Sequence, residues 1–375
     1  MIVFELRYAT SRFAGTRANV PNKSILPTVI DQSARQRYPK RQNMGKCEHI
    51  YGKVMVFIAV EANAYRSLYK IALNSVRCYI KSTDYELKII DVFEDQRVAE
   101  KCNHTKIFYR KHCAASVYLN DAEWMLVLDA DTGVVNPNHC IEEYIDDRVN
   151  LIFYERFFNW EIMSGNYLVK NSRFSHDFLM RWANYEYKEG GLWWSGLDNG
   201  AVHAVVLESV IPKDSQPFRN CEAIWLRARD YDSYIPFVVC VRIYLGARRI
   251  WPGKLRLLPR AHGMARDRYH TNDEWCENDF MIHGWKENEI DQREGYRLPF
   301  KAPLNVSKCG ADYKGWLWKP EMKISIEAVK EMIRVTEMQY GDALPKKHLQ
   351  FPFFSQPNVG LCYPNCDDYY WFNDE

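Results

Sequence analysis

The sequence lacks an apolar run long enough to span a membrane. A transmembrane helix needs roughly 18 consecutive apolar residues, whereas the longest clear run in the first third of the chain, residues 54–60, has the length of a strand. The first fifty residues also lack the pattern of a secretory signal peptide. We therefore expect no membrane span in this chain, and no signal or anchor is visible in it.

The chain also lacks an excess of charge of one sign. It has 50 basic and 48 acidic residues among 375, so no global field attracts nucleic acid or an anionic membrane. Its hydrophobic content of 47% is ordinary for a globular protein. We find no internal repeat and no low-complexity tract. The composition therefore favours a globular protein with a large core and no nucleic-acid partner.

Composition along the chain predicts three segments. Residues 1–50 are rich in Lys and Arg and poor in apolar runs, so we expect a basic, loosely ordered arm. Residues 51–290 should form the main domain. From about residue 210 the alternation of predicted strands and helices gives way to irregular segments rich in aromatic residues and proline. Residues 291–375 are expected to form an irregular extension that packs on this domain or trails it.

Apolar periodicity predicts an alternation of strands and helices over the first 210 residues. The predicted strands are residues 53–60, 86–92, 107–109, 124–128, 149–154 and 167–170. The predicted helices are residues 65–81, 110–119, 174–187 and 198–207. This order is typical of an α/β fold with a parallel or mixed sheet flanked by helices.

Two carboxylates follow the continuous apolar run at residues 124–128. Asp129 and Asp131 are separated only by Ala130, and Gly133 begins the turn that comes next. This is the carboxyl end of a predicted strand, where open α/β sheets bind their ligands. Neighbouring carboxylates repel unless a cation compensates them, and oxygen ligands suit Mg²⁺ or Mn²⁺. The alternative is a solvated loop that happens to contain two acids.

The eleven cysteines are an odd number, so they cannot all pair with one another. Cys362 and Cys366 form the only close pair, around a Pro-Asn turn, and predict a small disulfide loop in a secretory compartment. A zinc site there would need two further ligands. Glycosylation sequons at Asn22, Asn103 and Asn305 are compatible with that compartment.

Several segments occur in an order that is informative. The strand KVMVFIAV is followed by the D-A-D turn, the stretch SGNYLVKNS, the D-N pair of GLDNGAVH and the late HGWK. In this order they resemble nucleotide-sugar glycosyltransferases of the GT-A fold, which have a single Rossmann-like domain, over roughly residues 50–290. The chain looks most like a nematode-expanded family of uncharacterised glycosyltransferases. It is more distantly similar to the family of yeast galactosyltransferase and plant xyloglucan xylosyltransferase.

The resemblance implies a metal-dependent glycosyltransferase. The donor would be a UDP-sugar, the acceptor a hydroxyl of a glycan or glycoconjugate, and the anomeric configuration would be retained. The location would be the Golgi lumen of the secretory pathway. Asp129, Asp131 and a distant His283 would hold Mn²⁺ or Mg²⁺, so we expect these three side chains to converge at the carboxyl edge of the sheet.

The resemblance also implies donor contacts and catalytic residues. Asp198 would face the sugar or the acceptor, and Lys286 would lie near the leaving diphosphate. The end of the first strand would border the uracil. The implied donor- and cofactor-binding residues are Ala59, Val60, Glu61, Lys111, Asp129, Ala130, Asp131, Gly284 and Lys286. Two features depart from those relatives: Lys286 follows His283 more closely, and D-N often reads D-Q there.

Simpler interpretations stand beside these roles. His283 can be a hydrogen-bonded core histidine, Asp198 a helix N-cap, and Lys286 a surface lysine. A phosphatase of the haloacid dehalogenase type also has D-x-D after a strand, but it needs Thr or Val where this chain has Gly133. A non-catalytic protein that binds nucleotide sugars or glycans on the same fold is the other alternative.

Overall fold

The structure is a computed structural model of the chain. It describes residues 47–61, 68–156, 161–191, 194–246, 248–258, 260, 263–287, 298–301, 303–310 and 312–343. All of them belong to the larger of two contact units, residues 38–375. The predicted Cys362–Cys366 loop and almost all of the predicted basic arm lie outside the described residues.

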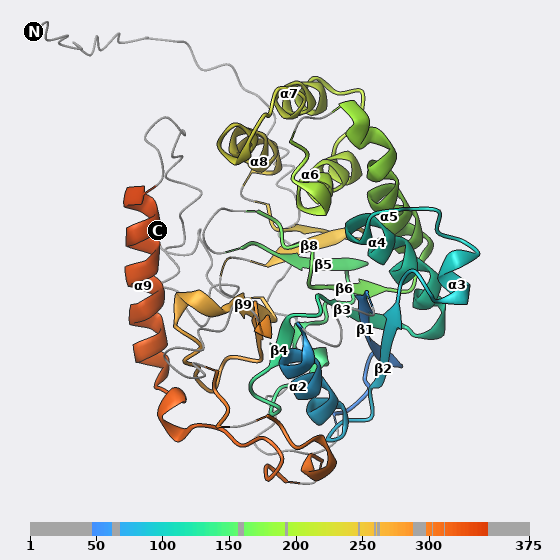
Figure 1. Cartoon of the computed structure of the whole chain (residues 1–375). Coiled ribbons are helices and arrows are strands. Elements are labelled where there is room, and N and C mark those ends of the chain that lie inside the picture. The colour runs from blue at the N-terminus through green and yellow to red at the C-terminus, as the bar shows by residue number, and fades with distance from the viewer. Residues whose placement is uncertain are drawn as a thin grey trace, which may run out of the picture. The chain divides into compact units, whose positions relative to one another are not determined.

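A seven-stranded mixed sheet lies at the centre of this unit, with the strand order β2-β1-β3-β6-β5-β8-β7 (Figure 1). The strands are β1 Val54–Val60, β2 Glu86–Asp91, β3 Trp124–Leu128, β5 Leu151–Tyr154, β6 Tyr167–Lys170, β7 Ile250–Trp251 and β8 Leu255–Leu258. β1 pairs in parallel with β2 and β3, whereas β6 runs antiparallel to β3 and β5. The carboxyl ends of β1, β3 and β5 therefore lie at one edge of the sheet.

Side chains of β1 contribute to the core on both faces of the sheet. Met55 and Phe57 belong to one hydrophobic cluster, whereas Val54 and Val56 belong to the other. This division follows from the strand geometry, because successive side chains point to opposite faces. All four are buried, as is typical of a strand between two layers.

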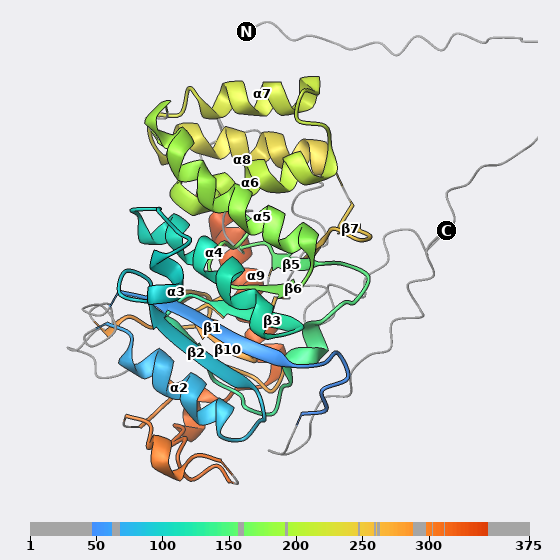
Figure 2. The same ribbon diagram turned by 90° about the vertical axis from the view of Figure 1, so that its right-hand side faces the viewer.

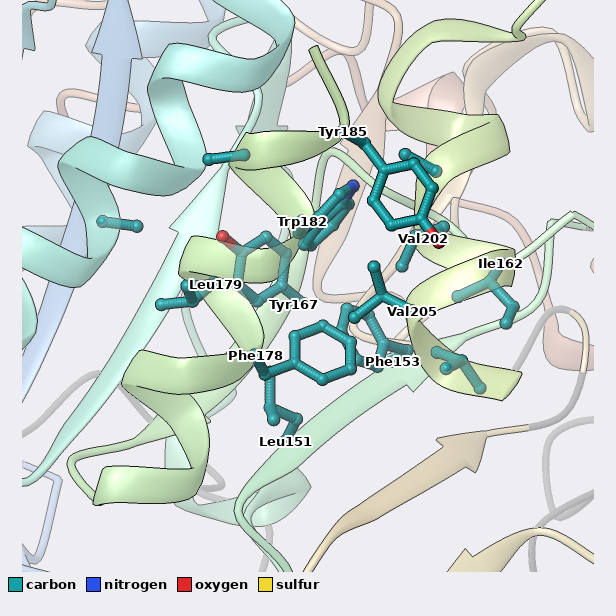
Figure 3. Close-up of a cluster of buried hydrophobic side chains, with 14 of the residues drawn as sticks. Leu151, Phe153, Ile162, Tyr167, Phe178, Leu179, Trp182, Tyr185, Val202 and Val205 are labelled. Carbon is teal, nitrogen blue, oxygen red and sulfur yellow. The ribbon is translucent and has the colours of Figure 1, made fainter. Parts of the chain in front are cut away.

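Helices cover one face of the sheet, and Figure 2 shows α5, α6 and α8 on the side opposite α2. These helices are α3 Gln96–Ala99, α4 Ile107–Tyr118, α5 Arg173–Ala183, α6 Leu197–Val210, α7 Gln216–Trp225 and α8 Tyr231–Leu245. Aromatic rings fill the space between them and the sheet (Figure 3). Phe153 of β5 lies 5.7 Å from Phe178 of α5, and Tyr167 of β6 lies 5.4 Å from Trp182, measured between ring centroids.

The other face is covered by α2 (Lys70–Ile80) and by a second, three-stranded sheet. This sheet has the order β4-β10-β9, with β4 Thr132–Val134, β9 Ala265–Asp267 and β10 Met281–His283. Later in the chain comes α9, Ile326–Ala343. Short 3-10 turns are η2 Leu119–Asp121, η3 Ile141–Tyr144, η4 Asn184–Gly191, η5 Arg268–His270, η7 Val306–Lys308 and η8 Pro320–Met322. Among the described residues, no helix combines the length and apolar character needed to cross a membrane.

The mixed sheet flanked by helices confirms the predicted α/β fold class. The strand predicted at residues 107–109 is wrong, because these residues form the first turn of α4. A three-residue apolar run is too short to separate a strand from a buried helix. The irregular structure predicted after residue 210 is also wrong, because α7 and α8 form there, with N-caps at Ser215 and Asp230. The extension predicted as irregular contains the regular helix α9.

Four disulfides connect described residues, two of them over 93 and 231 positions and two over 11 and 19 positions. They join Cys47 to Cys140, Cys78 to Cys309, Cys102 to Cys113, and Cys221 to Cys240. Sequence spacing predicted none of these pairs. Cys47 and Cys140 also lie near Glu142 in a group with the residue types of a metal site. Because both sulfurs are engaged in a disulfide, they are not available as thiolate ligands.

Candidate metal and donor site

Strand register brings the D-A-D turn and a distant histidine together. β4 begins at Thr132, directly after the turn, and β10 pairs with it so that His283 lies opposite Thr132. On the other side of β10, β9 places Asp267 opposite His283. The N–H of Gly284 donates to the carbonyl oxygen of Asp131 at 3.1 Å. Backbone pairing therefore fixes His283 beside Asp131.

Asp129, Asp131 and His283 form one cluster. Nε2 of His283 lies 3.3 Å from Oδ1 of Asp131 and 3.9 Å from Oδ2 of Asp129. One candidate ligand atom from each residue lies within 4.8 Å of the other two. Two carboxylates and an imidazole are a donor set that suits Mg²⁺ or Mn²⁺. The residue types and their separation therefore fit a divalent ion.

Charge compensation within the cluster is strong. Burial alone would raise the pKa of Asp131, but the neighbouring His283 lowers it to about 2. Burial alone would lower the pKa of His283, but Asp131 and Asp267 raise it to about 10. Nζ of Lys286 lies 3.6 Å from Oδ2 of Asp131. Asp131 is therefore ionised at neutral pH, with the His283 imidazole and the Lys286 ammonium group beside it.

The Ser-Gly-Asn stretch before β6 shapes the D-A-D turn. Oδ1 of Asn166 accepts hydrogen bonds from the Asp129 N–H at 3.0 Å and from the Thr132 hydroxyl at 2.9 Å. Nδ2 of Asn166 donates to the Tyr154 hydroxyl at 3.0 Å. Gly165 is required here, because a Cβ at this position would lie 1.9 Å from Oδ2 of Asp129. Only the family resemblance marks this stretch in the sequence, whereas these contacts show that Asn166 holds the backbone of the D-A-D turn.

Lys111 connects the cluster to α6. Its Nζ lies 3.0 Å from Oδ1 of Asp129 and 2.7 Å from Oδ2 of Asp198. Burial would lower the pKa of Lys111, but these two carboxylates raise it above its ordinary value. Asp198 is only 1% exposed, so its carboxylate is directed into the protein. The interpretation of Asp198 as an N-cap is wrong, because Gly196 holds that position in α6.

The end of β1 and Tyr69 lie at the margin of the site. Val60 is buried, Ala59 is half-buried and Glu61 is exposed. Burial raises the pKa of Tyr69, and the negative charge of Asp131 raises it further. Tyr69 therefore lies within electrostatic reach of the cluster. No sequence pattern pointed to it, because it lies inside the helix predicted at residues 65–81, whereas α2 begins only at Lys70.

The remaining predicted residues surround the two ends of this cluster. Ala130 is buried between the two aspartates. Gly284 has φ of +103°, which favours glycine, where the chain leaves β10. The side chain of Lys286 is 36% exposed, so it is both near the carboxylates and accessible to a ligand. Asp267, which binds the far side of His283, was missed because its neighbourhood has no recognisable motif.

A family model described as "Protein of unknown function, DUF273" matches residues 76–298. This is more than half of the chain, which therefore belongs to that family. The search of curated proteins gives no match.

Two solved structures show a distant likeness. One is the "crystal structure of a glycosyltransferase involved in the glycosylation of the major capsid of PBCV-1", with 14% identity, a TM-score of 0.32, and coverage of 62% of this chain and 93% of that chain. The other is the "Crystal Structure of A197 from STIV", with 13% identity, a TM-score of 0.22, and coverage of 34% and 66%. Function is therefore inferred from the site itself.

Proposed function

We propose that this protein is a metal-dependent glycosyltransferase. It transfers a sugar from a nucleotide diphosphate donor, with a UDP-sugar as the first candidate, to a hydroxyl of a glycan or glycoconjugate. The observation that carries the proposal is the convergence of Asp129, Asp131 and His283 within 4.8 Å at the carboxyl edge of the mixed sheet. The resemblance to the nematode-expanded glycosyltransferases supports the same assignment.

The side chains supply what departure of a nucleoside diphosphate requires. Asp129, Asp131 and His283 would hold Mn²⁺ or Mg²⁺, which acts as a Lewis acid toward the phosphates when bound. Lys286, 3.6 Å from Asp131, adds positive charge on the same side. This charge stabilises the transition state more than the ground state, because the leaving group gains negative charge as its bond breaks.

Asp198 is prepared to act as a fixed anion. Burial would raise the pKa of Asp198, but Lys111 and His112 hold it well below its usual range. The ammonium group of Lys111 thus lies between two carboxylates, that of Asp129 in the D-A-D turn and that of Asp198 in α6. Because Asp198 is only 1% exposed, it acts in this proposal through Lys111, whose ammonium group it holds beside Asp129. We propose retention of configuration on the family resemblance.

The disulfides support a location in the secretory pathway. Cross-links such as Cys47–Cys140 and Cys78–Cys309 form and persist in oxidising compartments. The sequon residues Asn103 and Asn305 are both exposed, so they are accessible to glycosylation. A lumenal enzyme of the Golgi type is consistent with a glycan acceptor.

A donor screen tests the proposal. Purified protein is incubated with individual nucleotide sugars, with and without Mn²⁺, and release of the nucleoside diphosphate is measured. We expect release from at least one donor, and we expect a chelator to abolish it. Titration calorimetry with UDP should likewise show binding that depends on the ion, because phosphates and carboxylates repel without it. Binding of UDP without turnover of any donor would favour the non-catalytic alternative.

A further inference from the structure

Asp267 lies behind His283, on the side away from the D-A-D turn. Nδ1 of His283 lies 2.7 Å from Oδ1 of Asp267. Nε2 of the same ring faces the other way and lies 3.3 Å from Asp131. The bond made by one imidazole nitrogen sets the orientation of the ring and the role of the other nitrogen. Asp267 therefore determines which nitrogen of His283 faces the two aspartates.

Asp267 is itself held firmly in place. It is 6% exposed, and the β9–β10 pairing sets it opposite His283. Nη2 of Arg156 lies 3.4 Å from its Oδ1, and Nε2 of His270 lies 3.8 Å from its Oδ2. Strand pairing and these two neighbours therefore fix the position of the carboxylate behind His283.

We propose that Asp267 is a positioning residue for the metal site. It holds the His283 ring through Nδ1 so that Nε2 is presented to an ion bound by Asp129 and Asp131. The inference rests on the proposed function, because only a metal-binding His283 requires this orientation. The three-stranded sheet β4-β10-β9 thus aligns the D-A-D turn, the imidazole and the supporting carboxylate in one row.

Binding of Mn²⁺ alone to the full chain tests the proposal. The free ion is measured by electron paramagnetic resonance during titration of wild type, Asp267→Ala and Asp267→Asn. Loss of such an outer carboxylate typically weakens metal binding about 10- to 100-fold, and we expect this for Asp267→Ala. A smaller loss is expected for Asp267→Asn, because its amide oxygen still accepts the bond from Nδ1.

The matched control is Asp146→Asn. Asp146 is also buried, at 2% exposure, and also pairs with cationic side chains, Arg148 and Arg256. It precedes β5 and lies away from the carboxyl edge, so its loss should leave Mn²⁺ affinity unchanged. Melting temperatures in chelator report folding, and saturating Mn²⁺ should restore donor turnover in Asp267→Ala if only metal affinity has fallen.

The outcomes separate this inference from the proposed function. Equal Mn²⁺ affinity in wild type and Asp267→Ala overturns the positioning role and leaves the metal site intact. Equal losses in Asp267→Ala and Asp146→Asn also overturn the role, because the effect would then be one of general stability. Wild-type protein that binds no Mn²⁺, with or without UDP, overturns both proposals. If Asp267→Ala fails to fold, Asp267→Leu replaces it, because leucine is similar in size to aspartate but cannot accept the bond from Nδ1; unchanged affinity in this variant overturns the role and weakened affinity supports it.

Discussion

Two buried aspartates in this molecule meet their cationic partners in different ways. Asp146, before β5, accepts hydrogen bonds from Nε and Nη2 of Arg148 at 2.8 and 2.7 Å, and from Nη1 of Arg256 at 2.8 Å. Asp131, at the carboxyl edge, lies 3.3 Å from the His283 imidazole and 3.6 Å from the Lys286 ammonium. One carboxylate is bound closely by guanidinium groups, whereas the other has longer contacts and a second carboxylate beside it.

The difference separates a structural ion pair from the site where we propose that a metal ion binds. A planar guanidinium matches a carboxylate with two short bonds, and such a pair has little to gain from another ligand. An imidazole and an ammonium are less demanding partners, and the side chain of Lys286 is 36% exposed. We infer that Asp131 can exchange its contacts with His283 and Lys286 for contacts with a metal ion, whereas Asp146 keeps its bonds to Arg148 and Arg256.

The largest expected effect is that of Asp131→Asn on activity. Removal of one charge from the ligand set should lower donor turnover by at least about 100-fold, the scale seen when one preorganised electrostatic group is lost. The melting temperature in chelator should change little, because the two side chains have the same shape and His283 keeps its bond to Asp267. A variant that melts far earlier than wild type would make Asp131 structural.

Asp146→Asn should show the opposite pattern. Breaking a buried pair from one side costs roughly 3–5 kcal/mol of stability, because the partner charge stays buried without compensation. The Arg256 side chain, 9% exposed, is the group left in that position. We expect a clearly lower melting temperature and normal turnover per folded molecule at low temperature. Lost turnover at an unchanged melting temperature would erase the distinction between the two aspartates.

The sequence identifies one half of the candidate site by local chemistry. Asp129 and Asp131 follow a buried strand, and this signal needs only residues that are adjacent in the chain. His283 entered through the resemblance, because its distance from the turn depends on the register of β4 and β10. Asp267 and Tyr69 have no local pattern that marks them. Their roles depend on tertiary pairing, which periodicity does not encode.

The fold shows the same limit. The strands at β1, β2, β3, β5 and β6 were predictable, because continuous apolar runs between turn residues are typical of buried strands. α8 was missed because its sequence, YDSYIPFVVCVRIYL, is apolar on most sides and contains Pro236. A helix buried between other helices lacks the one-sided pattern by which helices are recognised. Burial on several sides therefore removes the sequence pattern by which helices are recognised, whereas it produces the continuous apolar run by which buried strands are recognised.

Two histidines extend the comparison to titration. Nε2 of His203 accepts a hydrogen bond from the Ile162 N–H at 3.0 Å, and its Nδ1 donates to the Asn199 carbonyl at 2.6 Å. If Nε2 were protonated, its N–H would face the N–H of Ile162, and neither group could accept a hydrogen bond. Burial lowers the pKa of His203 from 6.5 to about 4. His203 is therefore neutral in the folded protein at physiological pH, whereas the pKa of His283 is raised to about 10.

Stability should therefore fall as the pH falls from about 6.5 toward 4. In this window the unfolded chain binds the proton and the folded chain does not, so acid favours unfolding. One pH unit across the window costs roughly 1.4 kcal/mol for one such histidine. Melting temperatures between pH 7 and 5 should fall less steeply for His203→Gln than for wild type. A slope that is unchanged in the variant would show that His203 does not titrate in this way.

The smallest expected effect is that of Lys286→Ala on UDP binding in the presence of Mn²⁺. One exposed charged contact contributes about 1 kcal/mol or less, so we expect roughly a five-fold loss of affinity. The loss should grow at low ionic strength and shrink at high salt, because the contact is partly open to solvent. Lys314→Ala is the control, because Lys314 pairs with Asp312 at 2.9 Å and is 81% exposed. If Lys286→Ala and Lys314→Ala bind UDP as wild type does, Lys286 is a surface lysine, and only the carboxylates and His283 distinguish the surroundings of Asp131 from the ion pairs of Asp146.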